Sequence, residues 1–340
     1  MANMALVCAC IVALSHVGYD TDVGSAGWWF VRMTRCGICC LAVPFFFVVS
    51  GYFLSRHFGE PGWWRKETAK RLMSLAVPYL VWGAIFLVFA RLGVSAMRLL
   101  AGKGFALSFP LAKLWHVFGV NLSATPMLVP TWYMRALFLI VLLSPALALL
   151  GRWRWAVLAE VAFFALYVCF SPHRNGLPST AAEHFLYYGL SLMGIAYFFA
   201  GVLFRKSGCL DRTLGVTPWA GVAALAAGIL LLAWRVHCIA VSGGEPFPVL
   251  CLAIPLLVAG TWLVVPAKPW PKWLTSLSFP IYVMHFFVIF ALDGFRAPRV
   301  NKSIGFMFAE FAAAVAVPSV IVLLLRRIFP RAAAFAFGGR

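Results

Sequence analysis

A few polar side chains stand inside long apolar stretches of this chain, and they are the ones whose types could support chemistry. His16, Arg135, Glu160 and His285 are the ionisable members of this set. Ionisable groups at membrane depth are costly, so each one is a candidate for function. A neutral imidazole can take a proton from a hydroxyl, which suits His16 to general-base catalysis. The alternative is a packing histidine that bonds to a neighbouring carbonyl.

Arg135 and His285 each allow two interpretations. A guanidinium keeps its charge, so Arg135 could orient a substrate or stabilise a developing oxyanion. It could also extend to the membrane interface and remain solvated. His285 lies near the middle of an apolar stretch, where it either lines a substrate cavity or makes a structural hydrogen bond between helices. Glu160 has no obvious partner in the sequence, and we interpret it as structural or protonated.

The elements that must position these residues are membrane-spanning helices. Of the 340 residues, 63% are hydrophobic and 11% are charged, and the mean hydropathy is +0.93. Soluble domains are about 45–50% apolar and about 25% charged, so this chain cannot cover itself with a polar surface. The same composition excludes disorder. We therefore predict an all-α polytopic membrane protein.

Apolar stretches long enough to cross a bilayer predict about ten transmembrane helices. They cover residues 3–18, 37–55, 72–91, 129–150, 154–170, 185–204, 216–235, 247–266, 276–292 and 304–325. The distribution of Lys and Arg between the loops predicts that both termini face the cytoplasm. Residues 93–128 are mixed in character and are expected to form a long loop with an interfacial helix. Residues 1–340 are expected to form a single integral-membrane domain.

The basic residues give the chain a net charge of +18, but their placement argues against a nucleic-acid partner. They fall between apolar blocks and do not follow one solvated face. The densest basic cluster spans residues 56–71, read as a loop that is either merely solvated or gathers a polyanion such as a nucleotide thioester. Cys36, Cys39 and Cys40 lack a second cysteine pair and a nearby histidine, so no metal site is predicted.

Several motifs resemble the integral-membrane family known as acyltransferase type three. Residues 43–54 read VPFFFVVSGYFL, the hallmark of that family, and a basic segment ending at Lys70-Arg71 follows. Residues 130–135 (PTWYMR) and 278–285 (SFPIYVMH) match two further family segments, and His16 occupies the position of the family's first histidine. The motifs occur in the family's order over nearly the whole chain, and residues 130–135 look most like the branch that acylates cell-surface polysaccharides.

The resemblance implies O-acyl transfer from a coenzyme A thioester, usually acetyl-coenzyme A, to a hydroxyl of a cell-surface or secreted glycan. It implies a multi-pass protein of the bacterial cytoplasmic membrane, and some relatives carry a further extracytoplasmic domain whose role a separate partner could fill here. The expected site residues are the catalytic His16, Arg135 and His285, the donor-binding Ser50, Arg65, Lys66, Lys70 and Arg71, and the acceptor-binding Trp132, Tyr133 and Tyr282.

One position departs from the family pattern. The family pairs a Lys or Arg with the first histidine, with ten residues between them, and here that position is Ala5. The cation could come from another helix, or the chain could begin elsewhere. Two rival functions follow: a non-catalytic descendant, and a transporter or flippase whose midplane His and Arg bind substrate. No inverted repeat supports the transporter.

Overall fold

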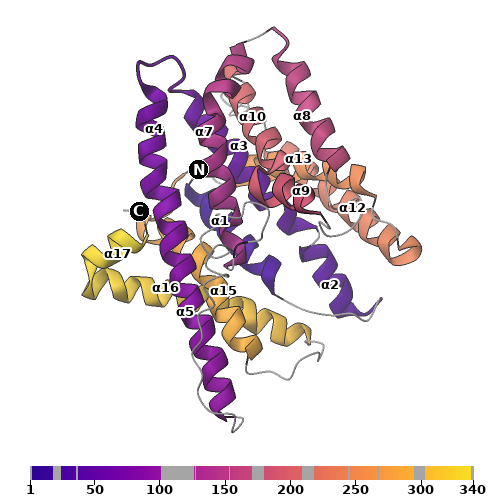
Figure 1. Ribbon diagram of the computed structural model, residues 1–340. Helices are drawn as coiled ribbons and strands as arrows, with labels where there is room; N and C mark the ends of the chain where they lie inside the picture. Colours follow the sequence, from indigo (N-terminus) through magenta and orange to yellow (C-terminus); the bar gives the residue numbers. More distant parts are fainter. Residues whose placement is uncertain are drawn as a thin grey trace.

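In the computed structural model, the part of the chain that can be described comprises residues 2–17, 24–35, 37–100, 126, 128–152, 154–170, 180–208, 218–243, 246–265, 268–294 and 303–337. All regular secondary structure within these ranges is helical, which confirms the all-α prediction. Figure 1 shows the helices packed against one another as a bundle.

The main helices coincide in large part with the predicted apolar stretches. They are α1 (Ala2–His16), α3 (Ala42–Ser55), α5 (Val77–Leu100), α7 (Trp132–Arg152), α8 (Ala156–Phe170), α10 (Leu192–Ser207), α12 (Pro218–Ser242), α13 (Phe247–Val264), α15 (Ser278–Gly294) and α16 (Ile304–Ile328). Shorter elements join or extend them: α2 (Ala26–Arg35), η1 (Ile38–Leu41), α4 (Trp63–Arg71), η2 (Leu72–Ala76), η3 (Val129–Thr131), α9 (Ala181–His184), η5 (Phe185–Gly189), α14 (Lys272–Thr275) and α17 (Pro330–Ala336).

Six helical segments in the described part of the chain are long and apolar enough to cross a membrane. Three more apolar helices are shorter, α1, α8 and most of α15. A helix of 15 residues, the length of α1, is about 22 Å long, whereas the hydrocarbon layer is about 30 Å thick. The chain is therefore a multi-pass membrane protein, but the prediction of ten spans is not confirmed, and neither is the direction of the termini.

Two predicted loops prove to be partly helical. Residues 63–71 were expected in the basic loop 56–71, but they form α4, which continues through η2 into α5 as one long helix (Figure 1). Within α4, Glu67 pairs with Lys70 and Arg71 at helical spacing, and such pairs favour the helix. The predicted loop 93–128 also begins too early, because α5 extends to Leu100. The predicted interfacial helix falls mainly on residues 101–125, outside the described residues.

Helices α1 and α15 pack together and run in the same direction. Near the start of α1, the Asn3 side chain bonds to the segment that precedes α14 and α15: it donates a hydrogen bond to the Lys268 carbonyl and accepts one from the Trp270 N–H, each 2.9 Å long. Further along both helices, the rings of His16 and His285 meet. Two helices joined at both levels in this way are parallel, which places the two histidines at one depth.

Helices α3 and α10 are packed so closely that glycine is required where they cross. A Cβ atom on Gly51 would lie 1.9 Å from the Phe198 carbonyl oxygen, and one on Gly201 would lie 2.0 Å from the Val48 carbonyl oxygen. Small residues permit this approach of two backbones within a membrane. Gly51 therefore has a packing role.

Replacing Gly201 with alanine should destabilise the protein by about 1–3 kcal/mol, since the added methyl group must push two backbones apart. The matched control is Gly93→Ala on α5, where an added Cβ would meet nothing within 4 Å. Thermal unfolding of both purified variants in the same detergent measures the difference. Equal unfolding temperatures would show that the α3–α10 contact does not require glycine.

Candidate active site

Two of the three predicted catalytic residues are brought together by α1 and α15. The ring centroids of His16 and His285 are 5.3 Å apart, with the ring planes inclined by 32°. His16 is the last residue of α1, and its ring also contacts Phe286 at 5.4 Å. His285 is completely buried. Residues 269 positions apart in the chain thus form one histidine pair, so His285 is not an isolated packing residue.

The hydrogen bonding of His285 fixes which of its nitrogens is free to act. Its Nδ1 lies 2.9 Å from the Ile281 carbonyl oxygen, one turn back in α15. A carbonyl only accepts, so Nδ1 carries the proton and donates it. In the neutral ring, Nε2 then holds the lone pair. Nε2 makes no hydrogen bond to any described residue, so it remains available to a substrate or to the neighbouring His16.

A cavity of about 370 Å³ opens beside the beginning of α15, and four predicted binding residues line it. They are Ser50 on α3, Arg71 at the end of α4, Tyr133 on α7 and Tyr282 on α15. Ala5 on α1 lines the same cavity, so the position without the family's cation shares this cavity with Arg71. Three residues separate Tyr282 from His285, a rise of about 4.5 Å along the helix. The cavity lining on α15 therefore ends about one helical turn before His285, and neither histidine is among the lining residues.

Tyr282 joins two of the sequence motifs. Its hydroxyl donates a hydrogen bond to the carbonyl of Pro130, at the start of the 130–135 segment. Its ring lies 6.3 Å from that of Tyr133, which in turn packs edge-on against Phe47 at 4.8 Å. The Tyr282 hydroxyl is thus engaged in holding η3 against α15. Tyr282 therefore lines the cavity with its aromatic ring and not with its hydroxyl oxygen.

Arg135 lies inside the protein, not at the membrane interface. Its side chain is 7% exposed, and its guanidinium interacts with the hydroxyl of Tyr79 on α5. A buried guanidinium must be matched by oxygen atoms, and Tyr79 supplies one of them. Of the acceptor-binding candidates, Trp132 is half-buried beside it, while Tyr133 reaches the cavity.

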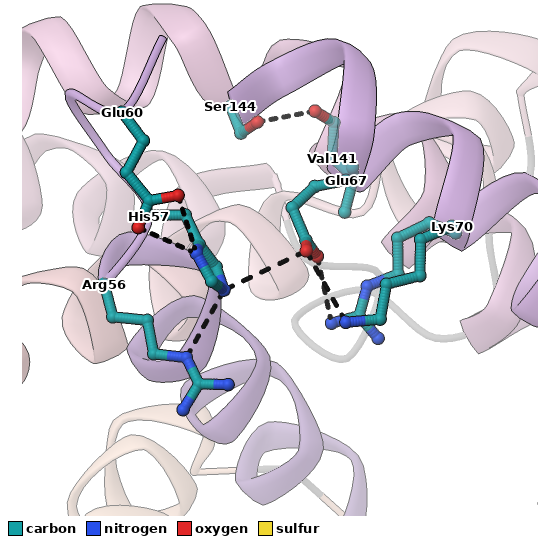
Figure 2. Close-up of polar contacts among 8 residues, drawn as sticks. Arg56, His57, Glu60, Glu67, Lys70, Val141 and Ser144 are labelled. Atoms are coloured by element: carbon teal, nitrogen blue, oxygen red, sulfur yellow. Dashed lines mark hydrogen bonds and ion pairs between the residues drawn. The ribbon is translucent and has the colours of Figure 1, made fainter. Parts of the chain in front are cut away.

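The predicted donor-binding cations divide into two groups. Arg65, Lys66 and Lys70 are exposed on α4, whereas Arg71 is partly buried at the cavity. Figure 2 shows the Glu67 carboxylate between His57 and Lys70; its oxygens lie 3.9 Å from His57, 3.5 Å from Lys70 and 3.6 Å from Arg71. Within the described part of the chain, Arg65 and Lys66 make no ion pair. The positive charges of Arg65 and Lys66 are therefore exposed on α4 and are not neutralised by a described carboxylate.

Three residues near the site were not among the candidates identified from sequence. Glu67 and Tyr79 belong to the expected basic segment and to the helix after it, but nothing in their spacing showed that they would hold Arg71 and Arg135. Arg35, at the end of α2, is close enough to His16 to interact with it electrostatically. A cation near His16 thus comes from another helix, one of the explanations considered for Ala5.

The polar side chains of the site suit proton transfer and anion binding. Among the described residues, no group of three His, Cys, Asp or Glu side chains is placed to hold a metal ion. The polar groups near the histidine pair are imidazoles, phenols and guanidinium groups. Such groups can take up a proton, line an organic substrate and balance negative charge.

The fold and the site together define a multi-pass membrane protein with a buried histidine pair beside a cavity. Comparison of the sequence with known protein families identifies the family to which the chain belongs. A family described as an acyltransferase domain matches residues 5–325. The chain belongs to this family, as the sequence motifs predicted.

One curated relative is a succinoglycan biosynthesis protein, ExoH, of Rhizobium meliloti (strain 1021). The two sequences are 28% identical over 182 residues, which is 49% of this chain. The match covers 45% of the relative, less than half of its length. No solved structure gives a significant match.

Proposed function

We propose that this acyltransferase is an O-acetyltransferase, which moves an acetyl group from coenzyme A to a hydroxyl of a cell-surface or secreted glycan. The meeting of His16 and His285 beside a cavity is the observation that carries the proposal, because acyl transfer to a hydroxyl requires a base. The name of the succinoglycan biosynthesis relative supports a glycan acceptor.

In the proposed reaction, His16 takes the proton of the acceptor hydroxyl as that oxygen attacks the thioester carbonyl. The new ester C–O bond forms, the C–S bond breaks, and the protonated imidazole returns its proton to the departing thiolate. His285, with Nδ1 held by Ile281, presents Nε2 toward this exchange and orients the His16 ring. No other group needs to gain or lose a proton.

The carbonyl oxygen of the thioester gains negative charge as the acceptor attacks. Arg135, with its charge buried and oriented by Tyr79, is the cation we assign to stabilise that oxyanion. Arg35, which interacts with His16 from α2, contributes positive potential at the same depth. Trp132 and Tyr133 then provide aromatic surface for the sugar.

The parallel arrangement of α1 and α15 supports a path for the donor through the protein. With the predicted ten spans and both termini in the cytoplasm, α1 would be the first span and α15 the ninth, and two such spans run in the same direction. The cavity lined by Ala5, Arg71 and Tyr282 would then face the cytoplasmic half. We place coenzyme A there and the glycan at the far end, beside His16, in a bacterial cytoplasmic membrane.

The exposed cations of α4 should set the affinity for the donor. Changing both Arg65 and Lys66 to glutamate is expected to raise the KM for acetyl-coenzyme A about tenfold with little change in kcat, since these residues attract phosphates and take no part in the chemistry. Steady-state kinetics at low ionic strength measure the effect, which salt should weaken.

The control for this change is the pair Arg327→Glu and Arg331→Glu, which alters the net charge equally at exposed positions away from α4. An equal rise in KM in both double variants would show that only the overall charge matters.

The proposal is tested with purified protein in nanodiscs, radiolabelled acetyl-coenzyme A and a panel of surface glycans. Label that reaches a glycan establishes both donor and acceptor. Label that binds without transfer favours a separate extracytoplasmic transferase that completes the reaction, or a non-catalytic descendant. No binding of the thioester would contradict the proposal and favour a glycan or lipid transporter.

A further inference from the structure

A second cavity lies on the other side of α3 from the candidate active site. It has a volume of about 410 Å³ and is enclosed by α3, α8, α10 and α13. Cavities of this size hold small-molecule ligands. Its lining is apolar, with Trp262, Phe164 and Val48 among the larger contributors, except for three polar side chains: Tyr52, Glu160 and Tyr197.

The Glu160 carboxyl and the Tyr197 hydroxyl belong to the lining of the same cavity and interact electrostatically. Tyr197 is 3% exposed, and both Glu160 oxygens are buried. None of these three oxygen atoms makes a hydrogen bond to any residue in the described ranges. Polar atoms left without a partner in an apolar surrounding are costly, so this arrangement is one that a ligand would complete.

The chemistry of the lining restricts the ligand. Among the described residues, no Lys, Arg or His lines the cavity, and the nearby Arg205 donates its hydrogen bond to the Tyr52 hydroxyl. A phosphate or another anion inside the cavity would therefore meet Glu160 without an opposite charge in the lining. A hydroxyl group pairs with the carboxyl group in either of its protonation states, because it both donates and accepts. The remaining apolar lining fits a hydrocarbon chain. The acetyl donor, with its phosphates, does not meet these requirements.

Part of the cavity lining lies at the apolar outer surface of the helices. Phe204, which lines it, is 38% exposed, and the neighbouring outer face of α8 carries exposed Leu158 and Val161. A lipid could therefore enter from the membrane without crossing water. Two of the helices that line the cavity, α3 and α10, are held close together by the contacts at Gly51 and Gly201.

We propose that this cavity is a binding site for a membrane lipid with a free hydroxyl group, such as a diacylglycerol. One acyl chain lies among the apolar residues, and the hydroxyl bonds to Glu160 and Tyr197. The site is separate from the acyl-transfer site. The two cavities share α3 as a wall, with Phe45 and Val49 on the lipid side and Phe46 and Ser50 on the other.

Photolabelling of the purified protein in nanodiscs tests this site. The probe is a diacylglycerol with a diazirine in one acyl chain, and the comparison probe is phosphatidic acid with the same chain. Wild-type protein should be labelled on peptides of α8, α10 and α13, and unlabelled diacylglycerol should compete. Ala259→Trp, at the exposed rim of the cavity, should reduce labelling at least fivefold.

Tyr197→Phe removes one oxygen atom and keeps the shape, so labelling should fall about three- to tenfold, as expected for one lost hydrogen bond. Leu158→Trp, a matched insertion on the exposed face of α8, should leave labelling unchanged. Full labelling of Ala259→Trp, or labelling spread over other helices, would overturn the site. Equal labelling by phosphatidic acid, or no effect of Tyr197→Phe, would overturn the assignment of a hydroxyl group.

Discussion

Replacing His16 with alanine is expected to reduce acyl transfer by a factor of about 10² to 10⁴, the contribution typical of a general base. The expected loss falls on kcat. The donor cavity, lined by Ser50 and Arg71, does not include His16, so the KM for acetyl-coenzyme A should change little. Transfer of radiolabel to glycan in nanodiscs measures both constants.

Two comparisons separate this effect from damage to the fold. Ser15→Ala removes a hydroxyl that donates a hydrogen bond to the Val12 carbonyl, one turn back in α1, at 2.6 Å, and it should keep full activity. Imidazole added to His16→Ala should restore part of the rate, because the missing base is then supplied from solution. An unchanged rate in His16→Ala would move the base elsewhere, with His285 as the next candidate.

His285→Phe should lower transfer about 100-fold, since it keeps a ring of similar shape and removes the nitrogen that faces the His16 side. If the histidines act as one unit, the double variant His16→Ala/His285→Phe should be no slower than His16→Ala alone. The assay is the same transfer measurement, carried out on the two single variants and the double variant in parallel.

His237→Phe is the matched control, because it makes the same chemical change at an exposed position of α12. It should behave as wild type. Losses that multiply in the double variant would show that His16 and His285 contribute independently, despite ring centroids only 5.3 Å apart.

The helices themselves could be predicted from the sequence because an apolar stretch in a membrane has few alternatives. Backbone N–H and C=O groups find no water in the hydrocarbon layer, so the chain must satisfy them internally as helix. Each predicted apolar stretch from 3–18 to 304–325 accordingly contains a helix. The predictions that differ from the structure lie at the ends of the apolar stretches, where a polar sequence predicts a loop but the helix continues. Residues 63–71 are polar but form helix α4, with Glu67 paired to Lys70 and Arg71.

The role of individual polar residues depended on contacts between distant segments. Spacing alone could not distinguish an Arg135 at the interface from the buried one that interacts with Tyr79. It also could not assign separate roles to Ser50, which lines the cavity, and Gly51, which packs against Phe198. Neighbouring residues on a helix face different directions, and only the packing of other helices decides what each direction meets.

The sequence by itself determined that this protein is a helical membrane protein of the acyltransferase family, because composition and ordered motifs are properties of the chain alone. Tertiary structure decided which residues meet. It brought His16 and His285 together through the parallel packing of α1 and α15, and it placed Arg71 and Ala5 at the same cavity. It also left Glu160 and Tyr197 facing an apolar cavity. Such contacts join segments up to 269 residues apart, and no local pattern encodes them.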